Sequence, residues 1–169
     1  MEKQGSIIVN GRKKLQDLKK QKVELFPNDF KALHTVTGIQ NAINDSEAQI
    51  SDNKPIFIVA GRMMAINKFG KTAFIRFKDR TGQLQAYVRK DHIGDMAYDI
   101  FKQLDIGDFI GLSGEMFKTK TGEWTLLVKK LKLISKATRP LPEKFHGLKD
   151  PEKRYRRRYL DLIVNPDIR

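Results

Sequence analysis

The most constraining feature of the sequence is an alternation of apolar and polar residues through two neighbouring segments, 72–78 and 83–90. A period of two is typical of a β-strand that buries one face and exposes the other. The segments flank the turn sequence Asp79-Arg80-Thr81-Gly82, so together they predict a β-hairpin. Its predicted inward face consists of Ala73, Ile75, Phe77, Leu84, Ala86 and Val88.

The opposite face of this hairpin combines aromatic, cationic and amide side chains. Its members, which alternate with the apolar residues, include Phe74, Arg76, Gln85 and Tyr87. Rings stack on bases, cations bind phosphates and amides bond base edges, so this face is typical of a single-stranded nucleic-acid surface. A solvated sheet face with one exposed phenylalanine is the alternative, and these residues alone leave both interpretations open.

The strand pattern continues on both sides of the hairpin. Further strands are expected at residues 56–66, 109–118 and 123–134, and an amphipathic helix at residues 93–104. Three strands, a helix and two strands follow the order of an oligonucleotide-binding (OB) fold, a five-stranded barrel with a helix between strands 3 and 4. We therefore predict a mainly β fold with helices. This order favours nucleic-acid binding, although some such barrels bind proteins or sugars.

Helical segments are expected on both sides of the barrel. Residues 10–22 and a segment opened by a capping box at Thr37 and Gln40 predict N-terminal helices, followed by a linker at 51–55. Asp150-Pro151-Glu152 opens a C-terminal linker helix, with proline suited to its first turn. The predicted parts are an N-terminal helical extension at 1–54, the OB domain at 55–136, and a linker and helix at 137–169.

The charge of the chain indicates the class of its partner. The 33 Lys and Arg residues against 20 Asp and Glu residues give a formal net charge of +13 over 169 residues. A field of this sign favours polyanions such as RNA, DNA or an acidic membrane surface. The absence of cysteine excludes disulfide and thiolate chemistry and fits a reducing cytosol. Without a signal-peptide core or an apolar run of ~20 residues, we expect a soluble, cytoplasmic protein with no membrane partner.

No arrangement of residues predicts catalysis or metal binding. Gly70-Lys71-Thr72 resembles the end of a phosphate-binding P-loop, but Ala65 stands where that motif needs its first glycine. His34, His92 and His146 lack metal-ligand spacing, and no set of serine, histidine and acid stands out. We therefore expect no catalytic residue, no metal site and no cofactor in this chain.

Three passages carry a specific resemblance to a known family. They are RPLPEKFHGL at 139–148, FKTKTGE at 117–123 and VAGRMM at 59–64. In these passages, and over essentially its whole length, the chain resembles bacterial-type class II lysyl-tRNA synthetases. The resemblance implies the N-terminal anticodon-binding domain of that family, truncated before the catalytic domain, whose signature motifs the sequence does not contain.

The resemblance implies recognition of the anticodon stem-loop of lysine tRNA, which has a U-rich anticodon. In the full-length family member, expected to be a homodimer, the catalytic domain ligates lysine to tRNA with ATP and Mg. Because this chain lacks the catalytic motifs, we expect it to be inactive alone.

The resemblance also implies roles for individual side chains. Phe74 matches the ring that stacks on the middle anticodon base, and Gln85 and Glu123 match side chains that hydrogen-bond that base. The family's arginine in the first hairpin is replaced by Asn67, so the neighbouring Lys68 is expected to supply phosphate charge only.

Five more residues complete the candidate RNA-binding set. Arg62 matches the family pattern, although a strand-bracing ion pair is an equal alternative for it. The others, expected to contact phosphates or bases, are Arg76, Tyr87, Lys118 and Lys120.

Two other functions remain open. The chain could be a general single-stranded nucleic-acid-binding module that uses its basic face without regard to sequence. It could also be a protein-interaction module that uses one side of the tail helix, where Tyr155, Tyr159 and Leu162 align. The arginines around them, at positions 154 and 156–158, form either a solvated or ion-paired face or a phosphate contact.

Overall fold

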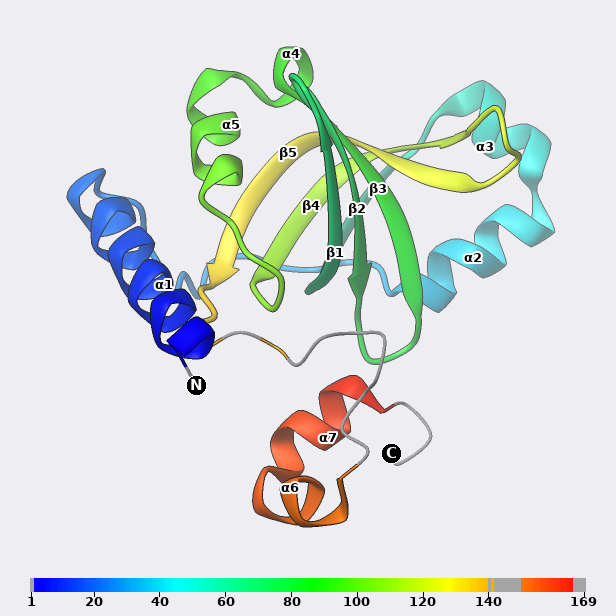
Figure 1. Ribbon diagram of the computed structural model, residues 1–169. Helices are drawn as coiled ribbons and strands as arrows, with labels where there is room; N and C mark the ends of the chain where they lie inside the picture. Colours follow the sequence, from blue (N-terminus) through cyan, green and yellow to red (C-terminus); the bar gives the residue numbers. More distant parts are fainter. Residues whose placement is uncertain (1, 140, 142–149, 166–169) are drawn as a thin grey trace. The chain divides into compact units, whose positions relative to one another are not determined.

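The computed structural model describes residues 2–139, 141 and 150–165 and divides the chain into two compact units (Figure 1). Unit 1 is Met1–Thr138 and unit 2 is Arg139–Arg169. Most of the passage at 139–148 that carried the family resemblance lies outside the described residues. The finer division of the chain into three parts stays a prediction.

Unit 1 is built on five strands that close into a barrel in the order β1-β2-β3-β5-β4. The β3–β5 pair is parallel and the other neighbouring pairs are antiparallel. The strands are β1 (Ile56–Phe69), β2 (Thr72–Lys78), β3 (Gln83–Arg89), β4 (Phe109–Lys118) and β5 (Trp124–Ser135). The predicted five-stranded OB fold is therefore confirmed.

The helix between strands 3 and 4 is present but divided. Helix α4 (Lys90–Ile93) ends at Gly94, and helix α5 (Asp95–Lys102) begins directly after it. Gly94 has a φ of 82°, a left-handed conformation that interrupts a helix and favours glycine. Helix α5 buries Tyr98 and Phe101.

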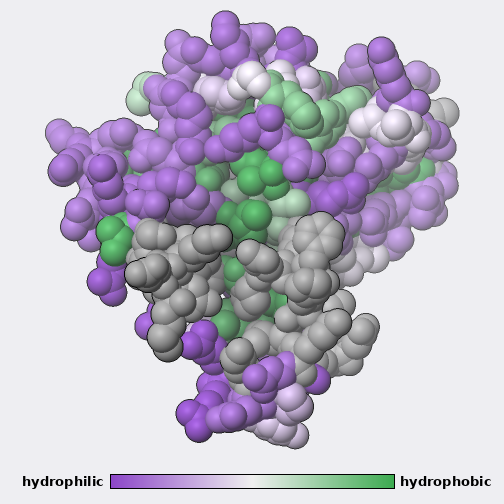
Figure 2. Space-filling model, in the orientation of Figure 1, coloured by the Kyte–Doolittle hydropathy of each residue, from purple (hydrophilic) through white to green (hydrophobic). Residues whose placement is uncertain are grey.

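The core lies inside the barrel, where alternate residues of each strand meet. All six residues of the predicted inward face of β2 and β3 are at most 5% exposed. Ile110, Leu112, Leu126 and Val128 of β4 and β5 are fully buried, whereas Trp124 is only partly buried. Hydrophilic residues cover most of the visible surface of unit 1 (Figure 2).

Three helices precede the barrel: α1 (Glu2–Lys20), α2 (Val36–Asp45) and α3 (Glu47–Asn53). The capping box predicted at Thr37 is wrong, because α2 begins two residues earlier than a Thr37 cap requires and its N-cap is Thr35, whose side chain accepts from the Gly38 N–H. Thr37 instead bonds Thr81 in the β2–β3 turn. The predicted linker at 51–55 is also partly helical, because α3 extends to Asn53.

The β2–β3 turn is tied to α2 by one carboxylate. Asp79 accepts from the backbone N–H groups of Val36, Thr81 and Gly82 at 2.7–2.8 Å. Burial raises the pKa of Asp79, but these hydrogen bonds to the charged form outweigh it and leave the pKa below its usual value. The ionised side chain therefore fixes the helix start against the hairpin.

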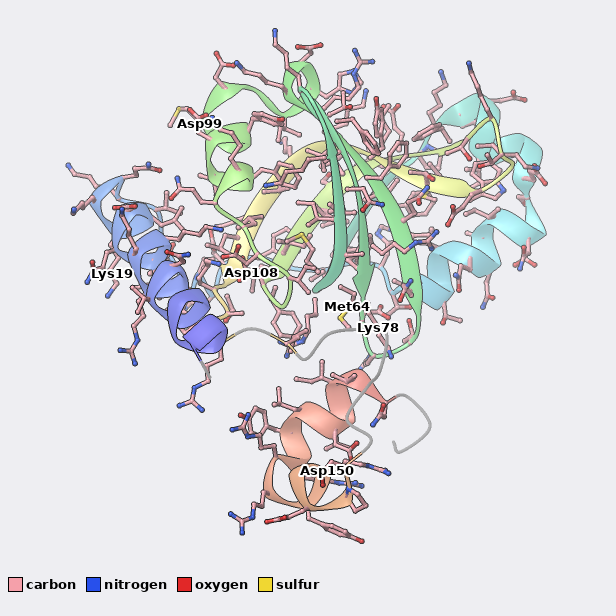
Figure 3. The ribbon with its side chains drawn as sticks, in the orientation of Figure 1. Lys19, Met64, Lys78, Asp99, Asp108 and Asp150 are labelled. Atoms are coloured by element: carbon pink, nitrogen blue, oxygen red, sulfur yellow. The ribbon has the colours of Figure 1, made fainter. Side chains whose placement is uncertain are left out.

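Helix α1 is tied to the barrel by a buried cluster of charges. The Lys136 side chain is fully buried and donates to Asp105 at 2.8 Å and Asp108 at 2.9 Å. Asp105, which follows α5, also pairs with Lys14 of α1. In Figure 1, α1 lies near the end of β5. Asp108, between α1 and the strands in Figure 3, accepts from the N–H groups of Asp105 and Ala137 as well. Buried charges persist only when they are paired in this way.

Unit 2 contains two short helices rather than the single helix expected from its sequence. Helix α6 (Pro151–Arg156) and helix α7 (Arg158–Val164) are separated by Arg157, whose φ of −128° and ψ of 51° are not helical. The predicted apolar stripe is thereby divided, since Tyr155 is 84% and Tyr159 is 52% exposed while Leu160 is buried.

Three arginines of unit 2 form ion pairs within the unit. Arg154 and Arg158 donate to the buried Asp161 at 3.1 and 2.8 Å. Arg156 pairs with Glu152 at 2.9 Å. These contacts favour the ion-paired interpretation of the arginine run over phosphate binding.

Candidate nucleic-acid interface

The antiparallel pairing of β2 and β3 brings the predicted outward residues together. Phe74 lies opposite Tyr87, and Arg76 lies opposite Gln85. All four side chains share one face of the hairpin, because alternate residues of a strand point to the same side. The Phe74 and Tyr87 rings stack, with centroids 4.6 Å apart and planes 29° apart. Each of these side chains remains partly exposed, as a base-stacking surface requires.

A third ring that the sequence analysis missed extends this surface. Phe117 of β4 has its ring centroid 6.1 Å from that of Tyr87. The signal was available in the sequence, because the apolar residues Leu112 and Met116 recur on one face of the expected strand at 109–118 and leave Phe117 on the opposite face. We call Phe74, Tyr87 and Phe117 the ring surface.

The two predicted base readers lie at the junction of β3 and β5. The parallel pairing places Gln85 opposite Thr125, and the Gln85 amide donates to the Thr125 hydroxyl at 2.9 Å. Glu123 precedes β5, and its backbone carbonyl and N–H bond Thr119 across the β4–β5 turn. The turn thus fixes the backbone from which the Glu123 side chain projects.

Arg76 and Glu123 form an ion pair across β3. The Arg76 Nη2 lies 2.9 Å from one carboxylate oxygen of Glu123 and 3.2 Å from the other. The two side chains are 44% and 40% exposed, so the pair lies at the surface and not in the core. Arg76 was expected to be a cation for phosphates, and the structure shows it partnered within the protein.

The lysines of the candidate set differ in their surroundings. Lys118 pairs with Glu47 of α3 at 2.8 Å and lies 5.9 Å from the Trp124 ring. Lys120 is exposed in the β4–β5 turn. Both lysines lie on the chain segment that leads into Glu123, Lys118 at the end of β4 and Lys120 in the β4–β5 turn.

Lys68 and Arg62 are engaged elsewhere. Lys68 donates to the Lys102 carbonyl of α5 at 3.3 Å, and burial lowers the pKa of its amine, with Lys14 acting in the same direction. Arg62 donates to the Gly107 carbonyl at 3.0 Å and its guanidinium lies 4.2 Å from the centre of the Phe109 ring. The structure thus gives Arg62 a bracing role at the loop before β4.

The described part of the chain contains no group of side chains that could hold a metal ion. It also contains no helix that is both long and apolar enough to span a membrane.

A comparison with known protein families shows which class of domain the barrel resembles. Residues 57–134, which contain all five strands except a few terminal residues, match the family model of the OB-fold nucleic acid binding domain. This segment of the chain is therefore similar to OB-fold nucleic acid binding domains, in agreement with the barrel topology.

The longer similarity is to lysine–tRNA ligases. The chain is 44% identical over 159 residues to the lysine–tRNA ligase of Halalkalibacterium halodurans, covering 94% of this chain and 32% of that protein. The enzyme of Cupriavidus taiwanensis is 43% identical over 167 residues, with 98% and 32% covered. The enzyme of Thermosipho melanesiensis is 44% identical over 158 residues, with 92% and 31% covered. The chain thus spans about a third of the length of these relatives, and the predicted resemblance to lysyl-tRNA synthetases is confirmed.

Proposed function

We propose that this chain binds the anticodon stem-loop of tRNA and that its ligand is lysine tRNA with a U-rich anticodon. The observation that carries the proposal is the outward face of β2 and β3, where stacked rings lie beside an amide and a carboxylate. The match to an OB-fold nucleic acid binding domain and the similarity to lysine–tRNA ligases support the same ligand.

In this proposal the ring surface holds the middle base and two polar groups identify it. Uracil presents an N3–H donor between two carbonyl acceptors. Glu123 accepts from N3–H, and Gln85 donates to a carbonyl with the N–H that its bond to Thr125 leaves free, since an amide carries two donors. Cytosine has an acceptor at N3, which the Glu123 carboxylate would repel.

Cations around this site contribute affinity more than selectivity. Lys118 and Lys120 precede Glu123 along the chain and are suited to the phosphates of the loop, Lys120 directly and Lys118 after release from its ion pair with Glu47. Phosphate contacts position RNA without reading its sequence, whereas base contacts specify it. We therefore assign positioning to the lysines and specificity to Gln85 and Glu123.

We also propose that a longer protein containing this chain ligates lysine to tRNA, with ATP and Mg as the other participants. The relatives named lysine–tRNA ligases are about three times as long as the matched region, so this chain would supply RNA recognition and another region the chemistry. A homodimeric state and a cytoplasmic location stay predictions.

The test measures binding to an anticodon stem-loop with UUU and to the same loop with UCU, at physiological salt. We expect a preference for UUU of about tenfold, the scale of one good base contact. Glu123→Gln should reduce this preference more than it reduces overall affinity. The matched control is Glu115→Gln, which removes another partly buried carboxylate of the barrel and should leave the preference unchanged.

Two outcomes would contradict the proposal. Equal binding to both loops with steep salt dependence would favour the general single-strand binder. Binding to neither loop, with self-association in sedimentation, would favour a protein-interaction module.

A further inference from the structure

The ion pair between Arg76 and Glu123 raises a question that the proposed function leaves open. Arginine on a nucleic-acid surface ordinarily binds phosphate. Arg76 instead directs one nitrogen at both oxygens of the Glu123 carboxylate, at 2.9 and 3.2 Å. Arg76 lies on β2 and Glu123 directly precedes β5, and the two residues meet across β3, so the contact depends on the closed barrel.

We infer that Arg76 is a positioning residue that sets base specificity through Glu123, and that it is not a phosphate-binding cation. The inference rests on the proposed function, because it concerns how the same site distinguishes uracil from cytosine. Among the residues that the structure describes, Arg76 is the side chain that contacts the Glu123 carboxylate.

The geometry explains why Glu123 needs this partner. Glu123 lies at the end of the β4–β5 turn, and its side chain is 40% exposed. The backbone alone therefore does not fix the rotamer of this side chain. Arg76 holds both oxygens in one place, and each carboxylate oxygen has two lone-pair sites, so an acceptor remains for the uracil N3–H. A base contact made by a fixed acceptor is more selective than one made by a mobile acceptor.

The charge of Arg76 has a second effect. A lone carboxylate beside RNA phosphates would repel them and would lose solvation when a base covers it. The guanidinium offsets that charge, so the acceptor can lie next to a polyanion. Because the positive charge of Arg76 is largely offset in turn by Glu123, its net attraction for phosphate is small.

The experiment measures the affinity ratio for UUU and UCU stem-loops, and its salt dependence, in four proteins. They are the wild type, Arg76→Gln, Glu123→Gln and the double variant. Arg76→Gln should lower the ratio about as much as Glu123→Gln does, and the double variant should lower it no further. Arg76→Lys, which keeps the charge, should restore part of the ratio. The slope of log affinity against log salt should stay unchanged.

A matched control separates this role from a general loss of charge. Lys78 is the next outward residue of β2, at the end of the strand in Figure 3. Lys78→Gln should leave the ratio unchanged. Thermal unfolding should confirm that Arg76→Gln is folded, because partly exposed ion pairs contribute little to stability.

Four results would overturn the inference. A uniform loss of affinity for both loops, with a salt slope smaller by about 0.7, would make Arg76 a phosphate contact. Additive effects in the double variant would make Arg76 and Glu123 independent. A wild-type protein that prefers UUU, together with an Arg76→Gln variant that prefers it equally, would refute the inference and leave the proposed function intact. A wild type without preference would refute both.

Discussion

Replacing Phe74 with alanine should weaken binding of the UUU stem-loop about tenfold. Stacking of one base on an aromatic side chain contributes ~1–3 kcal/mol, which corresponds to about 5- to 150-fold in affinity. The structure favours the lower half of this range, because Tyr87, 4.6 Å away, and Phe117 remain as a partial ring surface when Phe74 is removed. Loss of the Phe74–Tyr87 stack should also lower the free energy of unfolding by about 0.5–1.5 kcal/mol.

Fluorescence anisotropy with a labelled stem-loop, at constant salt, measures the effect. Phe74→Leu should bind nearly as weakly as the alanine variant, since it keeps apolar volume but has no ring. The matched control is Phe26→Ala, because Phe26 is 61% exposed and lies outside the barrel strands, so its removal should not change affinity. A folded Phe74→Ala protein with wild-type affinity would refute the stacking role.

Three further predictions concern the framework that holds the site and are tested by chemical denaturation. Asp79→Ala should lower the free energy of unfolding by about 1–2 kcal/mol, because it removes the carboxylate that accepts from the Val36 N–H at the start of α2. Because the pKa of Asp79 is lowered in the folded protein, this difference should be complete above about pH 4 and shrink as the pH falls further, and a constant difference would contradict it. Lys136→Met should lower the free energy of unfolding by about 3–5 kcal/mol, because it leaves the fully buried Asp108 without its cation. The control Lys132→Met removes an exposed ion pair and should change the free energy of unfolding little. Gly114→Ala should lower the free energy of unfolding by about 1–3 kcal/mol or more, because the new Cβ would lie 2.0 Å from a carbonyl oxygen of β5. A variant with wild-type stability would refute this steric argument.

The fold and half of the site could be predicted from the sequence because they depend on local periodicity. A period of two assigns each strand residue to a face, so the alternation alone places Phe74, Gln85 and Tyr87 on the outward face. The turn at 79–82 fixes which two strands pair. The same logic would have added Phe117, since its strand alternates in the same way.

The remaining features depend on contacts between distant segments. The Arg76–Glu123 pair joins residues 47 positions apart and requires the parallel β3–β5 pairing that closes the barrel. No local sequence pattern indicates that the barrel closes through this pair of strands. Similarly, Thr35 and Thr37 are both acceptable helix caps, and the choice of Thr35 follows from the bonds that tie the helix start to the β2–β3 turn.

Ion pairing also changes what the net charge of +13 implies for RNA binding. Among the candidate cations, Arg76 is paired with Glu123 and Lys118 with Glu47, while Lys68 bonds a carbonyl of α5. Releasing such a cation to a phosphate would require breaking an existing contact, which offsets the gain. We therefore expect phosphate contacts in the proposed function to be made by exposed residues such as Lys120, and the salt dependence of RNA binding to be shallower than the net charge suggests. With few phosphate contacts, the proposed discrimination between anticodon loops depends on the rings and base-edge groups, whose relative positions the closed barrel fixes.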